Sequence, residues 1–286
     1  MTVIELVQAM SARLDQAGVS FGHGTTNAFD EAAWLVLWKL RHALDQLDAV
    51  AGNEITPAQR AGVEALVDER IRTRKPAAYL TGEAWLQGVP FFVDERVIVP
   101  RSLIAEVLAD GTIDAWLTGR TQRVLDLCTG NGSLAVLAAL AWPEVMVDAT
   151  DLSADALAVA AKNVARHRLQ QRIRLRQGDG LAAASGRYDL ILCNPPYVNR
   201  DSMAALPAEF RAEPAIALDG GGDGMAFVRR LVRDLPKHLN DGGLLVLEIG
   251  HERTHFEAAF PRLEAVWLPT SAGDDQVLLL TRESLA

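Results

Sequence analysis

Hydrophobic residues recur at spacings of three and four over the first eighty residues, which is the period of an amphipathic helix. The apolar positions that carry this pattern include Ile4, Val7, Leu14, Trp34, Leu35, Leu37, Trp38 and Leu44. Thr56 followed by Pro57 has the N-cap and first-turn preferences of a further helix, and Lys75-Pro76 ends it. We therefore expect a small helical domain over residues 1–80, built from three helices.

The pattern changes to aromatic and β-branched residues between Thr81 and Pro100. Two short runs of this kind flank Gln87-Gly88, a pair typical of a tight turn, so residues 81–100 are predicted to form a β-hairpin linker. Ser102 can then cap a helix that we expect to continue to about Leu117.

Strand-like and helix-like segments alternate through the remainder, residues 101–286. Strands are expected over 123–128, 145–150, 172–176, 188–193, 243–249, 264–268 and 276–281, and helices over 133–141, 153–167 and 225–238. This alternation is typical of a parallel sheet with helices on both faces, so the second part is predicted to be an α/β domain.

Composition narrows the function classes. The formal charge of −9 argues against a surface that binds nucleic acid everywhere, although a local basic patch would escape this test. The chain has only two cysteines, and no apolar run approaches the roughly 18 to 20 residues of a membrane span. A disulfide scaffold and a membrane protein are therefore not expected, and a reducing cytoplasm is the simplest location. Two cysteines without paired histidines make a poor ligand set, so we expect no metal.

Polar turns follow three successive strands of the predicted sheet. The first strand contains Asp126 and leads through the glycine turn 128–132 into a helix, where backbone can approach a ligand closely. The second ends at Asp151, an acid placed to accept the hydroxyls of a ribose. The third leads to Gly178-Asp179-Gly180, which can meet an adenine edge. Taken singly, each feature has a structural alternative. The glycine turn can be a plain turn, Asp151 can help to cap the helix that starts at Ser153, and residues 178–180 can be an ordinary polar loop.

The fourth strand delivers Asn194-Pro195-Pro196-Tyr197 to the same sheet edge. Proline fixes φ and has no N–H, so this loop is rigid and leaves carbonyl oxygens free. The Asn194 side-chain oxygen and the Pro195 carbonyl can accept the two N–H groups of an amide and align its nitrogen for attack. Tyr197 can pack on the planar amide or exclude water. A plain loop after a strand is the alternative.

The order of these motifs resembles the class I S-adenosylmethionine-dependent methyltransferases, with residues 126–132 as the first motif and 194–197 as the amino-methylating motif. The resemblance implies a Rossmann-like, mostly parallel seven-stranded sheet, with S-adenosyl-L-methionine as cofactor and S-adenosyl-L-homocysteine as product. It implies cofactor contacts at Asp126, Thr129, Gly130, Gly132, Asp151, Asp179, Gly180 and Asn194. The family usually has glycine where Cys128 stands, a departure that we expect to leave the backbone contacts intact.

The acceptor of the methyl group is less constrained, because this tetrapeptide serves both glutamine side chains and exocyclic amines of bases. The helical N-terminal part, the hairpin and the run from Glu213 to Gly224 resemble the protein-glutamine N5-methyltransferases over essentially the whole chain. Pro100-Arg101-Ser102 and the loop 21–27 look like the branch that methylates large-subunit ribosomal protein L three. This implies a ribosomal protein as partner, free or in an assembly precursor, with rRNA contact secondary. It also implies that residues 1–80 form a substrate-recognition domain and residues 101–286 the S-adenosylmethionine-binding catalytic domain.

The implied substrate-binding residues are Asn194, Pro195, Pro196, Tyr197 and Arg101, and the implied catalytic residues are Asn194, Pro195 and Tyr197. Three other functions stay open: methylation of peptide chain release factors, amino-methylation of RNA or DNA, and a non-catalytic role in ribosome assembly. Arginines between residues 70 and 74 and between 166 and 176 keep the nucleic-acid alternative open. For His23, a structural role stands beside one in substrate docking.

Overall fold

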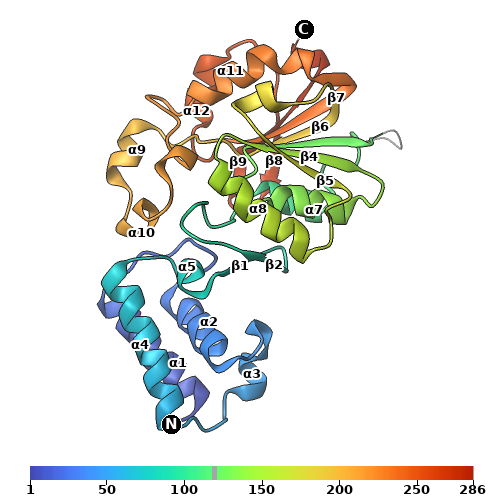
Figure 1. Ribbon diagram of the computed structural model, residues 1–286. Coiled ribbons are helices and arrows are strands. Elements are labelled where there is room, and N and C mark those ends of the chain that lie inside the picture. Colours follow the sequence, from blue (N-terminus) through green and yellow to red (C-terminus); the bar gives the residue numbers. More distant parts are fainter. Residues whose placement is uncertain (118–120, 286) are drawn as a thin grey trace.

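The computed structural model describes residues 1–117 and 121–285, and Figure 1 shows helices below a twisted sheet that carries helices on both faces. The N-terminal helices are α1 (Val3–Gln16), α2 (Ala28–Leu40), η1 (Leu44–Gln46), α3 (Leu47–Val50), α4 (Pro57–Thr73) and α5 (Ala77–Thr81). Thr56 caps α4 as expected, through a capping box with Gln59. Asn27 caps α2, and its side chain accepts a hydrogen bond from the Asp30 N–H.

The predicted hairpin is present as β1 (Glu83–Leu86) and β2 (Val89–Phe92), which pair antiparallel. Gln87 and Gly88 both have positive φ angles, 49° and 71°, as a two-residue hairpin turn requires. One apolar cluster unites the N-terminal helices with this segment and with Ala156 and Val159 of the α/β part. The division into 1–80, 81–100 and 101–286 therefore stays a prediction.

The main sheet has seven strands in the order β5-β4-β3-β6-β7-β9-β8. They are β3 (Arg123–Leu127), β4 (Met146–Asp151), β5 (Ile173–Gln177), β6 (Tyr188–Cys193), β7 (Leu239–Glu248), β8 (Val266–Thr270) and β9 (Gly273–Thr281). The first five are parallel, whereas β9 pairs antiparallel with both β7 and β8. The predicted α/β fold with a mostly parallel seven-stranded sheet is confirmed.

Helices cover both faces of this sheet. They are α6 (Ile104–Ala109), α7 (Ser133–Ala141), α8 (Ala154–Arg166), η2 (Gly180–Ala183), α9 (Arg200–Ala205), α10 (Ala208–Arg211), η3 (Ala215–Ala217), α11 (Ala226–Asp234), η4 (Leu235–Lys237), α12 (Arg253–Ala259) and η5 (Glu283–Leu285). Side chains of α6 and α7 pack on one face, whereas α11 and α12 pack on the other. Within the described residues, no helix combines the length and hydrophobicity needed to span a membrane.

One helix is shorter than predicted. The helix expected from Ser102 to Leu117 ends at Ala109, because Gly111 adopts a φ of 65° that breaks the helical path. Its N-cap is Leu103, while the Ser102 hydroxyl donates a hydrogen bond of 2.5 Å to Glu248. The short helices α9, α10 and α12 were not predicted, since one or two turns leave too little periodic pattern.

Candidate active site

A cavity of about 450 Å³ lies at the carboxyl ends of the parallel strands. Its volume falls within the range of roughly 300–1,000 Å³ that small-molecule sites occupy. Six of the residues that we expected to hold the cofactor line it: Thr129, Gly130, Asp151, Asp179, Gly180 and Asn194. Pro196 and Arg101 line it as well, whereas Asp126, Gly132, Pro195 and Tyr197 lie outside its lining. The four predicted strand ends therefore meet at one cavity.

The glycine turn approaches the cavity with unusual backbone angles. Cys128 has a φ of 62°, and Gly130 has a φ of 55°. A side chain on Gly130 would meet no atom within 4 Å, because this residue faces open space. A Cβ on Gly132 would instead lie 3.1 Å from the Cβ of Ala160 on α8. Gly130 thus leaves room for a ligand, and Gly132 permits close packing of α7 and α8.

Asp126 supports the turn from beneath. Its Oδ2 accepts hydrogen bonds from the Thr129 hydroxyl, at 2.5 Å, and from the Ala135 N–H, at 2.9 Å. Burial raises the pKa of Asp126 to about 7, despite these two hydrogen bonds. The carboxyl thus holds the strand end and the start of α7 together, and a direct cofactor contact by Asp126 stays a prediction.

Asp151 connects the second strand to the glycine turn. Its Oδ2 accepts a hydrogen bond of 2.9 Å from the Gly130 N–H, and its Oδ1 accepts one of 2.8 Å from the Ser153 N–H. Burial raises the pKa of Asp151. The carboxylate therefore stabilises the turn while facing the cavity. Asp179, by contrast, is exposed and pairs with Arg230 of α11 at 3.3 Å.

Three buried polar atoms around the turn make no hydrogen bond to any described residue: Asp126 Oδ1, Asn131 Nδ2 and Thr150 Oγ1. Buried polar groups are normally paired, so such atoms beside a cavity indicate a polar ligand. Asn131 and Thr150 both line the cavity, next to the open face of Gly130. These features fit a ligand with amino, carboxyl and hydroxyl groups, as S-adenosyl-L-methionine has.

The Asn194-Pro195-Pro196-Tyr197 loop is fixed by close packing. A Cβ on Gly220 would lie 2.7 Å from the Tyr197 Cα, and one on Gly250 would lie 2.6 Å from the Tyr197 ring. The glycine-rich run 220–224 therefore forms a turn under the loop. The Tyr197 hydroxyl donates a 3.3 Å hydrogen bond to Glu248, the buried acid that also accepts from Ser102. Neither the Asn194 side chain nor the Pro195 carbonyl hydrogen-bonds to another described residue. Asn194 lines the cavity, whereas Pro195 is buried and lies outside its lining.

Arg101 is held by an acid 112 residues away. Its two terminal nitrogens donate hydrogen bonds of 2.6 and 2.8 Å to the two carboxylate oxygens of Glu213. The same acid accepts from the Val99 N–H at 2.8 Å and lies 3.6 Å from the His23 ring. His23 also contacts the ring of Phe210 at 4.2 Å. His23 therefore joins the N-terminal part to the segment that follows the substrate loop.

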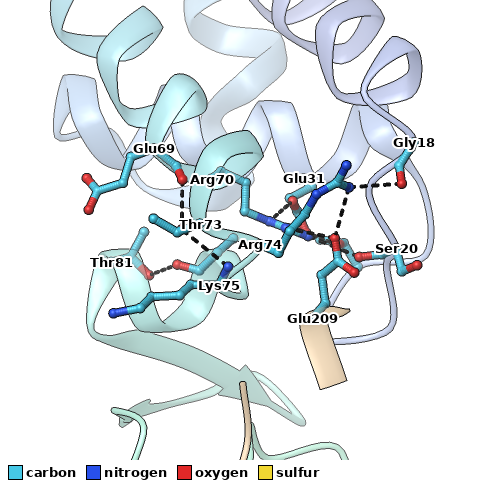
Figure 2. A network of polar contacts seen from close by, with 12 residues as sticks. Gly18, Ser20, Glu31, Glu69, Arg70, Thr73, Arg74, Lys75, Thr81 and Glu209 are labelled. Carbon is cyan, nitrogen blue, oxygen red and sulfur yellow. Dashed lines mark hydrogen bonds and ion pairs between the residues drawn. The ribbon is translucent and has the colours of Figure 1, made fainter. Parts of the chain in front are cut away.

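A second buried network strengthens this junction, and Figure 2 shows it from close by. Arg70 of α4 is fully buried, and its Nε donates a hydrogen bond of 2.8 Å to Glu31 of α2. A terminal nitrogen of Arg70 lies 3.3 Å from Glu209 of α10, and Arg74 reaches the same carboxylate at 3.3 Å. Figure 1 shows α10 extending from the sheet domain toward α4 and α5. The arginines between residues 70 and 74 thus include two that connect α4 to α10.

Several residues of the site escaped sequence reasoning. Phe227 and Arg230 of α11 line the cavity beside Gly180, as does Ile216 of η3. Glu213 and Glu248 hold Arg101 and Tyr197 in place. For Glu248 the sequence offers one local signal of a role in the site. An acid at the end of a buried apolar strand needs a polar partner.

Comparison with known proteins decides the family. Residues 105–241 match the family described as Methyltransferase small domain. The ribosomal protein uL3 glutamine methyltransferase of Bordetella pertussis is 55% identical over 289 residues, which cover 99% of this chain and 96% of the relative. The protein of the same name from Burkholderia pseudomallei is 51% identical, covering 99% and 95%. The chain belongs to the ribosomal protein uL3 glutamine methyltransferase family.

Solved structures agree on the fold of this methyltransferase. The catalytic domain of hMettl16, in complex with the MAT2A 3′UTR hairpin 1, superposes with a TM-score of 0.53 at 16% identity. The match covers 87% of this chain and 89% of the other. The expected class I methyltransferase family and fold are therefore confirmed, and S-adenosyl-L-methionine is the methyl donor of the enzyme.

Proposed function

We propose that this methyltransferase transfers a methyl group from S-adenosyl-L-methionine to the side-chain N5 of a glutamine in ribosomal protein uL3. The observation that carries the proposal is the Asn194 side chain, which lines the cofactor cavity in a rigid loop and makes no hydrogen bond to another described residue. The carbonyl of the adjacent Pro195 is the second acceptor that we propose. The names of relatives that match over nearly their whole length support this substrate. A ribosomal protein as substrate supports our proposal that the reaction takes place in the cytoplasm.

The loop residues act by positioning and electrostatics. An amide nitrogen is a poor nucleophile, because its lone pair is delocalised into the carbonyl. Acceptance of its two N–H groups by the Asn194 oxygen and the Pro195 carbonyl orients the nitrogen and stabilises the positive charge that develops on it. Bound S-adenosyl-L-methionine supplies an electrophilic methyl group on its sulfonium.

Tyr197 and Arg101 complete the arrangement. Tyr197 is held by Glu248, and burial raises the pKa of its phenol, so the ring stays neutral beside the amide. Pro196 packs along the cavity wall. Arg101 uses its terminal nitrogens on Glu213, so we assign it to shaping the substrate side of the cavity. The nitrogen loses its extra proton to water after transfer, and no strong base is required.

Release factors and bases in nucleic acid remain the alternative acceptors of the methyl group. A radiolabelled methyl-transfer assay with purified uL3, release factor and rRNA as separate acceptors distinguishes them. We expect label in uL3, and its loss in Asn194→Ala. Label only in rRNA or only in release factor contradicts the substrate, and unchanged labelling by Asn194→Ala contradicts the role of the loop. If uL3 is methylated only within an assembly precursor, the free protein should stay unlabelled and immature ribosomal subunits should be labelled.

A further inference from the structure

A second cavity, of about 290 Å³, lies in the N-terminal part of the protein. Its walls come from α2, from the segment of η1 and α3, and from Trp85 of the hairpin. Phe29 and Trp85 line it and are 40% and 41% exposed, which places two of the large exposed hydrophobic side chains in one hollow. Such gathering of exposed aromatic side chains around a cavity is typical of a protein interaction site.

Trp34 supplies a polar group to this cavity. Trp34 lines it, is only 7% exposed, and its indole N–H donates no hydrogen bond to any described residue. A buried donor without a partner costs free energy, so its presence in a cavity wall indicates an acceptor that arrives with a ligand. A peptide carbonyl is an acceptor of this kind, and the aromatic walls suit an apolar side chain next to it.

The charge around the cavity selects a basic partner. Of the described residues that line it, Asp30 is the only charged one. Asp45 and Asp48 follow Leu44 and Leu47, which also line the cavity, and all three aspartates are exposed. Arg41 is an exposed cation near this segment, so the acids outnumber the bases here. Within residues 1–117 and 121–285, none of the three forms an ion pair. Carboxylates around an apolar cavity that are free of ion pairs attract Lys and Arg side chains.

The loop before α2 connects this cavity to the active site. Gly24 and Thr25 line the second cavity, whereas the preceding His23 contacts Phe210 and lies 3.6 Å from Glu213. Glu213 in turn holds Arg101, which lines the cofactor cavity. A Cβ on Gly22 would lie 3.0 Å from the Phe210 ring, so the loop is packed tightly against the catalytic part. The loop therefore links the wall of the second cavity to the residues that hold Arg101.

We propose that the cavity formed around Phe29, Trp34 and Trp85 is a docking site for the protein substrate. It would bind a basic segment of uL3 that carries an apolar side chain and lies outside the methylated glutamine. The proposal rests on the proposed function. Ribosomal proteins contact rRNA through basic surfaces, which matches the acidic rim.

Steady-state kinetics with intact uL3 test the docking site. We expect Trp85→Ala and Phe29→Ala each to raise KM for uL3 at least about fivefold, with kcat and the KM for S-adenosyl-L-methionine unchanged. Trp116→Ala, which removes an exposed tryptophan outside both cavities, is the matched control and should behave as wild type. A short peptide around the methylated glutamine should show no difference between wild type and Trp85→Ala, since it cannot reach the docking site.

Two further variants probe the chemistry. Trp34→Phe keeps an aromatic ring but loses the N–H, so it should raise the melting temperature of the free enzyme and raise KM for uL3. Asp30→Asn combined with Asp45→Asn and Asp48→Asn should weaken the salt dependence of KM.

Wild-type KM for uL3 in both Trp85→Ala and Phe29→Ala overturns the docking site. If the wild-type enzyme is a dimer and Trp85→Ala is a monomer with unchanged KM for uL3, the cavity binds a second copy of this chain, and the docking site is also overturned. A wild-type enzyme that labels no uL3 overturns the proposed function itself.

Discussion

Arg101 and Glu213 are joined by two parallel hydrogen bonds, 2.6 and 2.8 Å long, although 112 residues separate them in the chain. Arg101 lines the cofactor cavity, whereas Glu213 follows the short helix that contacts the N-terminal part. This fork-to-fork pairing is the strong geometry for an ion pair, because the planar guanidinium matches both carboxylate oxygens. The pair therefore fixes the wall of the active site to the surface that meets the N-terminal helices.

Glu213→Gln should destabilise the protein by about 3 kcal/mol, because it leaves Arg101 with an uncompensated charge in a largely buried position. Methyl transfer to uL3 should fall with it. Urea unfolding gives the stability, and the exposed helical pair of Arg60 and Glu64 provides the control. Glu64→Gln makes the same chemical change there and should cost less than about 1 kcal/mol. Equal effects of the two substitutions would contradict the structural role of Glu213.

Low pH should weaken the ion pair between Arg101 and Glu213. Burial alone would raise the pKa of Glu213, but His23 and the Arg101 guanidinium outweigh it and lower the pKa to about 2. Ionised Glu213 thus stabilises the fold fully above its ordinary pKa of 4.5, and this contribution is lost as pH falls toward 2. The difference in unfolding free energy between wild type and Glu213→Gln should shrink between pH 5 and about pH 3. A difference that stays constant over this range would show that Glu213 is not ionised in the folded protein.

Cys128 should be a strained position. Its φ of 62° is a left-handed conformation that costs a residue with a Cβ roughly 1–2 kcal/mol, and glycine avoids this cost. Cys128→Ala keeps the Cβ and removes only the thiol, so it is the matched control. We expect Cys128→Gly to be more stable than Cys128→Ala by about 1 kcal/mol in thermal unfolding. A less stable glycine variant would show that the strain is relieved elsewhere.

Asp151→Asn should weaken cofactor binding by about 10- to 100-fold, the effect of losing a charged hydrogen-bond acceptor. The new amide also presents an N–H₂ group to a backbone donor, Gly130 or Ser153, that the carboxylate now satisfies. Isothermal titration with S-adenosyl-L-methionine measures the change. Asp155→Asn, in the exposed first turn of α8, is the control and should bind normally. Equal affinity of Asp151→Asn and wild type would exclude Asp151 from the cofactor site.

The sequence predicted the parts of the fold that depend on local pattern. Buried strands and polar turns placed the glycine turn, Asp151 and Asn194 at one sheet edge, because the carboxyl ends of parallel strands meet there. The residues that the sequence did not reveal are held by distant partners. Nothing near Arg101 announces Glu213, and nothing near Tyr197 announces Glu248, so these pairs appear only when the sheet order brings them together.

The N-terminal part shows the same division. The cap at Thr56 was predicted from the residue types of Thr56 and Pro57, and the structure confirms it. The cap at Asn27 was not predicted, although it also depends only on neighbouring residues. The cavity around Trp34 and Trp85 depends on contact between a helix and a hairpin that share no local motif. Aromatic residues at helical spacing predict a core, and only the fold shows which of them remain exposed.

The central claim is that this chain methylates a glutamine of uL3, and mass spectrometry of ribosomal proteins tests it most directly. Ribosomes from cells that lack the gene should contain uL3 lighter by one methyl group, with the change mapped to a single glutamine. Restoring the wild-type gene should return the methyl group, and the Asn194→Ala gene should not. Fully methylated uL3 in cells that lack the gene would contradict the account.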